Sequence, residues 1–345
     1  MNLTDDSGII GLYSSFSKSK KGEIMPPEMI ILCVILGIVA LIAVLVLLTS
    51  LVCFFMTFYS PKRKKLGEGE YDIPNGKIYE AHREQIIAWT KDIRKMPHER
   101  ITIKSFDGLT LVGNYYEHKK GAPTELLFHG YRGNSERDLC GGVHRCFALG
   151  RNALIIDHRA SGESEGSVIS FGINERHDCV SWANYASERF GSETRLILTG
   201  ISMGAATVML ASAERLPENV VCILADCGYS SAREIIKKVI CDMHLSPDFF
   251  YPFVCLGARI FGGFDLEETS PEIAVSKTKI PMIFIHGESD DYVPCDMSRE
   301  LYEKCSAEKK SIVTIPGAGH GLAFPVDQSA YIKALEDFED YACFL

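Results

Sequence analysis

The chain has 345 residues, with 45 Asp and Glu against 36 Lys and Arg, and a formal net charge of −9. This length suits one large domain with a small appendage, and the lack of a basic tract in the globular part argues against a nucleic-acid partner. The 12 cysteines show neither C-x-x-C nor zinc-type spacing. They indicate buried thiols in a reducing compartment, with disulfides as the alternative.

Two segments precede the globular part. Residues 1–27 are polar and small, and we expect a flexible terminus. Residues 28–60 are rich in Ile, Leu and Val and carry no charge from Met29 to Tyr59, which exceeds the roughly 20 residues that a bilayer span needs. We predict a single transmembrane helix. The alternatives are a secretory signal, against which the run is too long and lacks a small-x-small cleavage site, and a buried core helix.

The end of the predicted span bears on its orientation. Four basic residues follow it directly, against three lysines at a distance before it, so the positive-inside rule favours an orientation in which the C-terminal side faces the cytoplasm. The same cluster could also rest on anionic lipid headgroups. These residues are Lys62, Arg63, Lys64 and Lys65. Aromatic residues at the exit are expected to form an interfacial belt: Phe54, Phe55, Phe58 and Tyr59.

Residues 61–100 are predicted to form a basic juxtamembrane linker and an amphipathic helix. Ile78, Ile86 and Trp89 recur near helical spacing until Pro97 ends the pattern. We expect this helix to pack on the domain, and a position at the membrane surface is the alternative.

The predicted globular domain, residues 101–345, opens with two alternating runs on either side of Asp107 and Gly108, which predict a β-hairpin. Short apolar strands and helical stretches then alternate, so we predict an α/β fold with a mostly parallel sheet and helices on both faces. Its strands are expected at 125–128, 153–157, 195–199, 220–225, 281–285 and 311–315, and its helices at 137–149, 173–190, 205–215, 296–304 and 328–341. Reactive groups in such sheets lie beyond the carboxyl ends of the strands.

A G-x-S-x-G pattern occupies residues 200–204, between an apolar strand and a helical stretch. This placement is typical of a nucleophile elbow, in which glycines permit close packing and a strained turn exposes the serine hydroxyl. The bare pattern is common by chance, and its position between strand and helix strengthens it. Ser202 is therefore the candidate nucleophile.

A base and an acid should follow the serine in the order Ser, Asp or Glu, His. His320, in a glycine-rich loop after the last strand, is preferred as the base over His286, for which we expect a structural, turn-capping role, and over His244. Asp290 is preferred as the acid because of its spacing to the next turn. Its neighbour Asp291 is expected to be an exposed charge, and Asp226, at the end of the previous strand, is the rival.

Oxyanion donors are expected from two backbone N–H groups. One is that of Met203, directly after the nucleophile. The other is that of Tyr131, in the loop after the first strand that is followed by a helix. We expect His129 to buttress this loop and Arg132 to be solvated.

Together these motifs resemble the α/β-hydrolase superfamily from residue 101 onward. They comprise His129-Gly130-Tyr131, the segment 157–164, the serine elbow, His286-Gly287 with Asp290, and Gly319-His320. The resemblance is closest to membrane-anchored members of the serine-aminopeptidase and esterase-like group, including bacterial anchored hydrolases and depalmitoylase-like ones. It implies a cap insertion at about 229–270, whose aromatic residues would line an acyl pocket or merely attach the cap to the body.

The expected activity is cleavage of carboxylic esters or thioesters through an acyl-enzyme, with a small-molecule or lipid-like acyl substrate. A small aminopeptidase-like peptidase, an acyltransferase and a non-catalytic anchored binding module are the alternatives. No metal-binding or nucleotide-binding motif is present, so no cofactor is implied. Nothing in the sequence indicates an oligomeric state.

Overall fold

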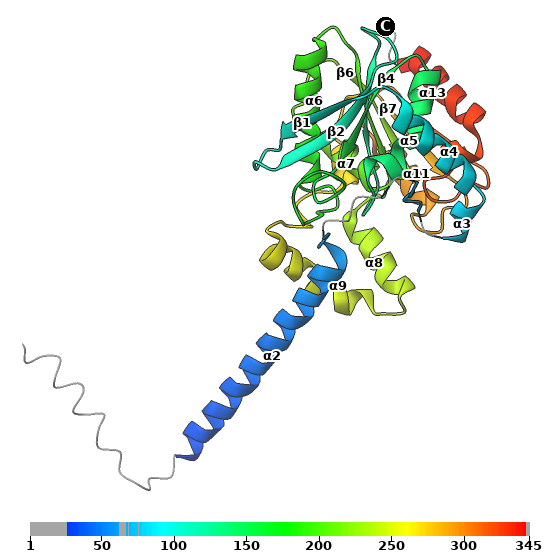
Figure 1. The fold of residues 1–345 in the computed structure, drawn as a ribbon. Coiled ribbons are helices and arrows are strands. Elements are labelled where there is room, and N and C mark those ends of the chain that lie inside the picture. Colours follow the sequence, from blue (N-terminus) through cyan, green and yellow to red (C-terminus); the bar gives the residue numbers. More distant parts are fainter. Residues whose placement is uncertain (1–25, 62–66, 68, 75, 343–345) are drawn as a thin grey trace, which may run out of the picture. The chain divides into compact units, whose positions relative to one another are not determined.

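The computed structural model describes residues 26–61, 67, 69–74 and 76–342 (Figure 1). It contains two units, which are treated separately below: the chain up to Thr49, and a folded body that begins at Ser50. Most of the predicted polar terminus (residues 1–25) and the basic cluster at 62–65 lie outside the described residues.

Helix α2 (Pro27–Thr57) is the predicted apolar helix. Among the described residues it is the one helix long and apolar enough to cross a membrane, with a mean hydropathy of 3.6 in its most apolar window. A signal sequence near an N-terminus has the same property.

The last turns of α2 differ from a simple span, because residues 50–57 belong to the folded body. Phe54 is 5% exposed and Phe58, just beyond the helix, is 0% exposed, and both lie in a hydrophobic cluster of the body. The expected aromatic belt is therefore wrong for these two residues. Phe55, at 48% exposed, remains open to the surroundings.

The body is built on an eight-stranded sheet in the order β1-β2-β4-β3-β5-β6-β7-β8. β1 and β2 form the predicted hairpin and β2 pairs antiparallel with β4, while all further pairs are parallel. The strands are β1 (Glu99–Lys104), β2 (Thr110–Tyr116), β3 (Thr124–Phe128), β4 (Asn152–Asp157), β5 (Leu196–Ile201), β6 (Val220–Asp226), β7 (Met282–Gly287) and β8 (Lys310–Ile315).

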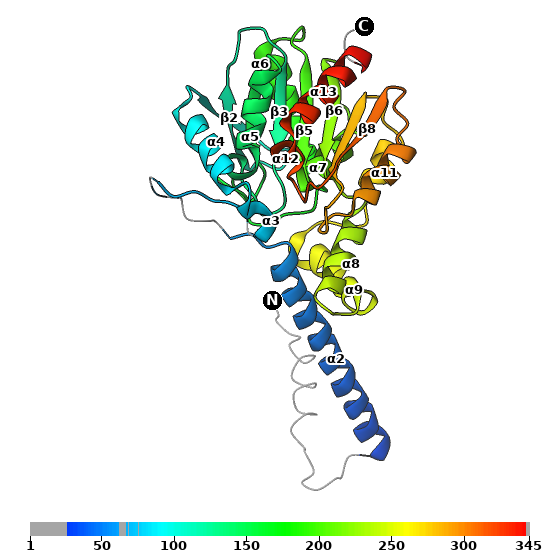
Figure 2. The same ribbon diagram turned by 90° about the vertical axis from the view of Figure 1, so that its right-hand side faces the viewer.

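Helices cover both faces of this sheet (Figure 2). One face packs against α4 (Arg83–Lys95), α5 (Ser135–Ala148), α12 (Ala323–Val326) and α13 (Gln328–Ala342). The other packs against α6 (Glu175–Phe190), α7 (Met203–Ala211), α10 (Pro271–Val275) and α11 (Cys295–Lys304). The helices differ from the predicted ranges by a few residues, chiefly at α7, which ends at Ala211.

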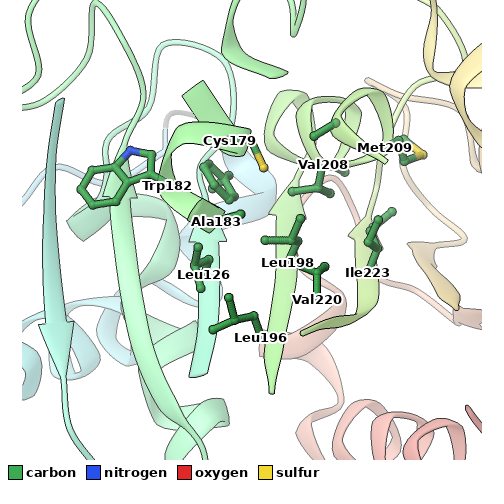
Figure 3. Close-up of a cluster of buried hydrophobic side chains, with 14 of the residues drawn as sticks. Leu126, Cys179, Trp182, Ala183, Leu196, Leu198, Val208, Met209, Val220 and Ile223 are labelled. Atoms are coloured by element: carbon green, nitrogen blue, oxygen red, sulfur yellow. The ribbon is translucent and has the colours of Figure 1, made fainter. Parts of the chain in front are cut away.

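The largest core cluster lies between the sheet and α6 and α7 (Figure 3). Leu126, Leu198 and Ile223 come from three neighbouring strands and are fully buried with Trp182 and Val208. The central strands read as continuous apolar runs because both of their faces are covered. Each such side chain stabilises the fold by roughly 1.5–3 kcal/mol, which keeps the loops at the carboxyl ends of the strands in place.

The segment between α2 and β1 packs on the body, as its apolar spacing predicts. It forms α3 (Lys77–Glu80) and α4 rather than one helix. Ile86 and Ile93 of α4 are buried in a cluster with residues of α5. Arg94 also forms a bidentate ion pair with Glu136, with a shortest N–O distance of 2.6 Å.

The segment between β6 and α10 contains α8 (Ala232–Asp242), α9 (Pro247–Gly257) and the short π-helix η1 (Ala258–Gly262). Ser231 begins α8 by accepting a hydrogen bond from the Glu234 N–H at 3.1 Å. Gly257 lies against the last turns of α2, and a Cβ there would meet the Ser50 carbonyl oxygen at 2.6 Å. This segment lies in the range where the cap insertion is expected, about 229–270, and is called the cap below.

Candidate active site

Ser202 occupies a strained turn between β5 and α7. Its φ of 57° and ψ of −114° lie in a region that residues with side chains seldom adopt, which costs about 1–3 kcal/mol. The turn is held by a hydrogen bond of 2.8 Å from the Ser202 N–H to the Asp226 carbonyl oxygen. The hydroxyl is thereby presented above the end of the sheet.

The two glycines of the motif are required by close packing. A Cβ at Gly200 would lie 2.0 Å from the Gly204 carbonyl carbon, and one at Gly204 would lie 2.1 Å from the Phe128 carbonyl oxygen. No side chain can be accommodated at such distances without moving the backbone. The local pattern therefore reflects a real requirement of the turn.

The structure brings Ser202, His320 and Asp290 together from three loops. His320 Nε2 lies 2.9 Å from Ser202 Oγ, and His320 Nδ1 lies 2.7 Å from Asp290 Oδ2. Assigned from this network, the imidazole carries its proton on Nδ1 and accepts the serine proton at Nε2. This is the arrangement in which a histidine can act as a base toward a hydroxyl.

Asp290 is fixed as a carboxylate by its surroundings. Its Oδ1 accepts hydrogen bonds from the N–H groups of Tyr292 and Val293, at 2.9 and 2.8 Å. Burial opposes ionisation, but hydrogen bonds from His286, His320 and Val293 hold the pKa of Asp290 well below its usual range. Asp290 is therefore anionic at neutral pH and can stabilise an imidazolium at His320.

His286 makes a contact within the site that the sequence did not predict. Its Nε2 lies 2.8 Å from the Val293 carbonyl oxygen and 3.2 Å from Asp290 Oδ2, and its Nδ1 lies 2.6 Å from Ser298 Oγ. The predicted turn-supporting contact is present, yet the same ring also contacts the carboxylate that faces His320. No local signal marks this, because the partners are separated turns.

The rival acid Asp226 has a different environment. Its Oδ2 accepts a hydrogen bond of 2.8 Å from the Tyr331 hydroxyl. Burial raises the pKa of Asp226 above its usual value, so this carboxyl is less suited to stabilising a positive imidazolium. Geometry and charge both favour Asp290.

The candidate oxyanion donors border the serine. Gly130 is so close that a Cβ there would lie 3.5 Å from Ser202 Cβ, and Tyr131 follows it. Within the described part of the chain, neither the Tyr131 N–H nor the Met203 N–H donates to another protein group. Both amides thus remain free to bind an oxyanion.

The two side chains expected to flank the Tyr131 loop behave differently: His129 supports the loop as predicted, whereas Arg132 makes contacts that were not predicted. His129 is fully buried, with Nδ1 2.8 Å from the Gly130 carbonyl oxygen and Nε2 accepting the His158 N–H at 3.0 Å. Arg132, expected to be solvated, instead donates to the carbonyl oxygens of Met56 and Tyr59 at 2.8 and 3.1 Å. The expectation for Arg132 was wrong.

A pocket of about 260 Å³ is lined by Ser202 and His320. Its walls come from the segment between α2 and β1, from α5, from strands β5 and β6, and from the start of α12 with the loop before it. They include Pro74, Tyr79, Ile86, Trp89, Arg137, Asp138, Gly141, Gly142, Arg145, Thr199, Asp226, Leu322 and Phe324. The cap supplies none of the residues that line this pocket.

The sequence did not predict that the segment between α2 and β1 contributes to the site. The Tyr79 hydroxyl donates to the His320 carbonyl oxygen at 3.0 Å, and Ile78 lies 3.2 Å from where a Cβ at Gly319 would be. Trp89 stacks on Phe324 with ring centroids 5.5 Å apart. The amphipathic spacing showed only that this segment packs, not that it packs beside the histidine.

Of the two alternatives for the aromatic residues of the cap, the structure favours attachment of the cap to the body over lining of a pocket. Tyr251 and Phe264 are buried in the cluster that joins the cap to α2, and Phe264 meets Phe58 with ring centroids 5.2 Å apart. Phe249 and Phe261 are 59% and 37% exposed. These side chains attach the cap to the body or face outward, and they do not line the pocket at Ser202.

Among the residues that the structure describes, one group of side chains has the spacing of a metal site: Cys227, Asp290 and His320, whose ligand atoms lie within 4.8 Å of one another. Two of these are already hydrogen-bonded to each other, and burial raises the pKa of Cys227 well above its usual value. A thiolate ligand is therefore disfavoured, and we assign no metal to this group.

Comparisons with known proteins agree with this architecture. Residues 268–327 match the family model described as serine aminopeptidase, S33. The uncharacterized protein YqkD of Bacillus subtilis is 26% identical over 251 residues, which cover 72% of this chain and 82% of YqkD. An esterase of Pyrococcus furiosus is similar in structure with a TM-score of 0.63 and 18% identity, over 84% of this chain and 99% of that one.

Alpha/beta hydrolase domain-containing protein 10 from mouse is also similar, with a TM-score of 0.53 and 18% identity, over 70% of this chain and 99% of that one. This chain has the α/β-hydrolase fold. The predicted fold is thus confirmed. The strand-end loops hold the serine, histidine and carboxylate in the order expected for this fold.

Proposed function

We propose that this chain is a membrane-anchored serine hydrolase that cleaves carboxylic ester or thioester bonds through an acyl-enzyme. The observation that carries the proposal is the continuous hydrogen-bonded path from Ser202 Oγ through His320 to Asp290, at 2.9 and 2.7 Å. A serine that is aligned with a histidine and an anionic carboxylate is an activated nucleophile.

In the proposed reaction, Ser202 Oγ attacks the substrate carbonyl carbon while its proton passes to His320 Nε2. The carbonyl oxygen becomes an oxyanion that accepts hydrogen bonds from the N–H groups of Tyr131 and Met203. The C–O or C–S bond then breaks, and His320 returns the proton to the leaving alcohol or thiol. A water molecule, deprotonated by His320, then attacks the acyl-enzyme carbonyl carbon. The bond to Ser202 Oγ breaks, the acid leaves, and His320 returns the proton to Ser202 Oγ.

The pocket supports a short or medium acyl group. Its volume of about 260 Å³ lies just below the roughly 300–1,000 Å³ of most small-molecule sites. Trp89 and Phe324 make part of its wall apolar, whereas Asp138 is committed to Arg137 at 2.6 Å and to the Gly130 N–H at 3.1 Å. Burial raises the pKa of Asp226, the other carboxyl that lines the pocket. A peptidase that takes a free amino terminus needs an unpaired carboxylate, so we infer that the pocket suits ester chemistry better than the aminopeptidase alternative.

The proposed anchor is α2, with the catalytic body on the cytoplasmic side. Support comes from the apolar length of the helix and from the four basic residues that follow it in sequence. Carbonate extraction of membranes should leave the full chain in the pellet. Protease added to sealed microsomes should digest the body, and protection of the body would reverse the orientation.

Labelling with a fluorophosphonate probe tests the catalytic proposal. Wild-type protein should be labelled, and Ser202→Ala should not be labelled, because the probe reacts only with an activated serine. The Ser202→Ala variant should keep its thermal stability within about 1 kcal/mol, since it removes one oxygen. Lack of labelling of folded wild type would refute the proposal. Comparing p-nitrophenyl esters with aminoacyl anilides then separates esterase from peptidase activity.

A further inference from the structure

The loop that carries the Tyr131 N–H is attached to the last turn of α2. The Tyr131 hydroxyl donates to the Thr57 carbonyl oxygen at 2.7 Å. Arg132 Nη2 donates to the Met56 and Tyr59 carbonyl oxygens at 2.8 and 3.1 Å. All of these residues lie within the folded body that begins at Ser50, so the contacts are internal to it.

The end of a helix is a favourable place for such contacts. The last four carbonyl groups of a helix have no partner within it and form the negative end of its dipole. At α2 the guanidinium of Arg132 and the hydroxyl of Tyr131 supply donors to these carbonyls. A positive charge at this position is also favoured by the dipole, so the attachment stabilises helix and loop together.

The conformation of the loop shows why it needs this support. Arg132 has a φ of 51°, in the left-handed region that disfavours side chains other than glycine and, to a lesser degree, asparagine. On its other side the loop is fixed by the Gly130 N–H, which donates to Asp138 Oδ2 at 3.1 Å. Tyr131 lies between these two attachments, and its ring packs on Phe171 with centroids 4.9 Å apart.

We propose that the last turn of α2 is a positioning element of the oxyanion hole. The Tyr131 hydroxyl and the Arg132 guanidinium, fixed to the helix-end carbonyls, hold the Tyr131 N–H where the oxyanion forms. The proposal rests on the proposed function, in which that N–H is an oxyanion donor. It gives the helix a second task besides anchoring, because the helix end is part of the support of the active site.

The test uses the full-length protein in detergent micelles with four variants. Tyr131→Phe removes only the hydroxyl that reaches Thr57. Arg132→Asn removes the guanidinium but tolerates the left-handed backbone, and Arg132→Lys keeps a donor. Tyr229→Phe is the matched control, because the Tyr229 hydroxyl also donates to a backbone carbonyl, that of Phe171 at 3.0 Å, in the same hydrophobic cluster.

Two readouts separate positioning from general stability. The first is kcat and KM for a short p-nitrophenyl ester. The second is the inhibition constant of a trifluoromethyl ketone, which forms a tetrahedral oxyanion with the serine and thus reports the oxyanion hole. Removing a whole donor costs about 10²–10³ in kcat, so a displaced donor should cost about tenfold.

The expected result is a loss of about tenfold in kcat for Tyr131→Phe and a larger loss for Arg132→Asn, with KM within twofold. The inhibition constant should rise by the same factors, and Arg132→Lys should recover most of the activity. If kcat and inhibitor affinity change no more than in Tyr229→Phe, the inference is overturned while the hydrolase proposal stands. Failure of wild type to react with the fluorophosphonate would instead overturn the hydrolase proposal.

Discussion

Replacing Asp290 with asparagine tests the assignment of the acid most directly. The carboxylate accepts the Tyr292 and Val293 N–H groups at Oδ1, and at Oδ2 it meets His320 at 2.7 Å and His286 at 3.2 Å. An asparagine has one accepting oxygen and one donating amide. If its oxygen serves the two backbone N–H groups, its NH₂ faces the two imidazoles.

This orientation forces His320 to accept at Nδ1, so its proton moves to Nε2 and it can no longer take the proton of Ser202. A wrong tautomer of this kind in a serine protease lowers kcat by about 10⁴. At 1.36 kcal/mol per tenfold, this is about 5 kcal/mol of transition-state stabilisation. We expect a loss of this order in Asp290→Asn, with little change in KM.

The assay is steady-state hydrolysis of a p-nitrophenyl ester, with thermal unfolding as a check on folding. Asp226→Asn is the matched control, because Asp226 also ends a strand, is buried and accepts a hydrogen bond from Tyr331. It should lose less than tenfold in kcat. The reasoning fails if Asp290→Asn keeps more than a tenth of wild-type activity, or if Asp226→Asn is the more damaged of the two.

Three further outcomes are expected. Gly204→Ala should destabilise the fold by about 4 kcal/mol or more, because its Cβ would lie 2.1 Å from the Phe128 carbonyl oxygen. Unfolding in urea measures the loss of stability, and a midpoint equal to that of wild type would contradict the prediction. Burial opposes ionisation of Glu125, but Arg145 and Arg151 lower its pKa from 4.5 to about 2. The folded state therefore binds this proton less readily than the unfolded chain. The free energy of unfolding of wild type should fall by roughly 3 kcal/mol as the pH falls from above 4.5 to 2. Glu125→Gln should be less stable at pH 7 and show a flatter pH dependence, and equal pH profiles would count against the pairing. Trp89→Ala should enlarge the pocket and shift the preferred acyl chain to longer esters, as an acyl-length series would show.

The sequence predicted the local parts of the molecule well. The eight strands lie within about two residues of their expected positions, because covered parallel strands are continuous apolar runs and the hairpin has a clear Asp-Gly turn. The elbow at residues 200–204 was also predicted from the sequence. Its glycines are required by close contacts within the strand–turn–helix unit and with the end of the adjacent strand. Ser202 and His320 follow from the motif and from the order of the chain.

The sequence was less informative about the surroundings of these residues. It ranked Asp290 above Asp226 by spacing alone, whereas the structure distinguishes them by their partners and by opposite pKa shifts. It left open whether the cap lines the acyl pocket, and the structure places α3 and α4 there instead. Periodicity indicates that a helix has an apolar face but not which surface that face covers.

The attachment of Arg132 to the end of α2 shows the limit most clearly. In the sequence, Arg132 is an isolated charge in a glycine-containing loop, for which solvation is the ordinary expectation. Only the tertiary structure brings it to the carbonyls of Met56 and Tyr59, more than 70 positions earlier. The sequence by itself therefore determined the strands, the elbow and the apolar helix, because each depends on neighbouring residues. The tertiary structure decided what supports the candidate site, because those contacts join segments with no local relation.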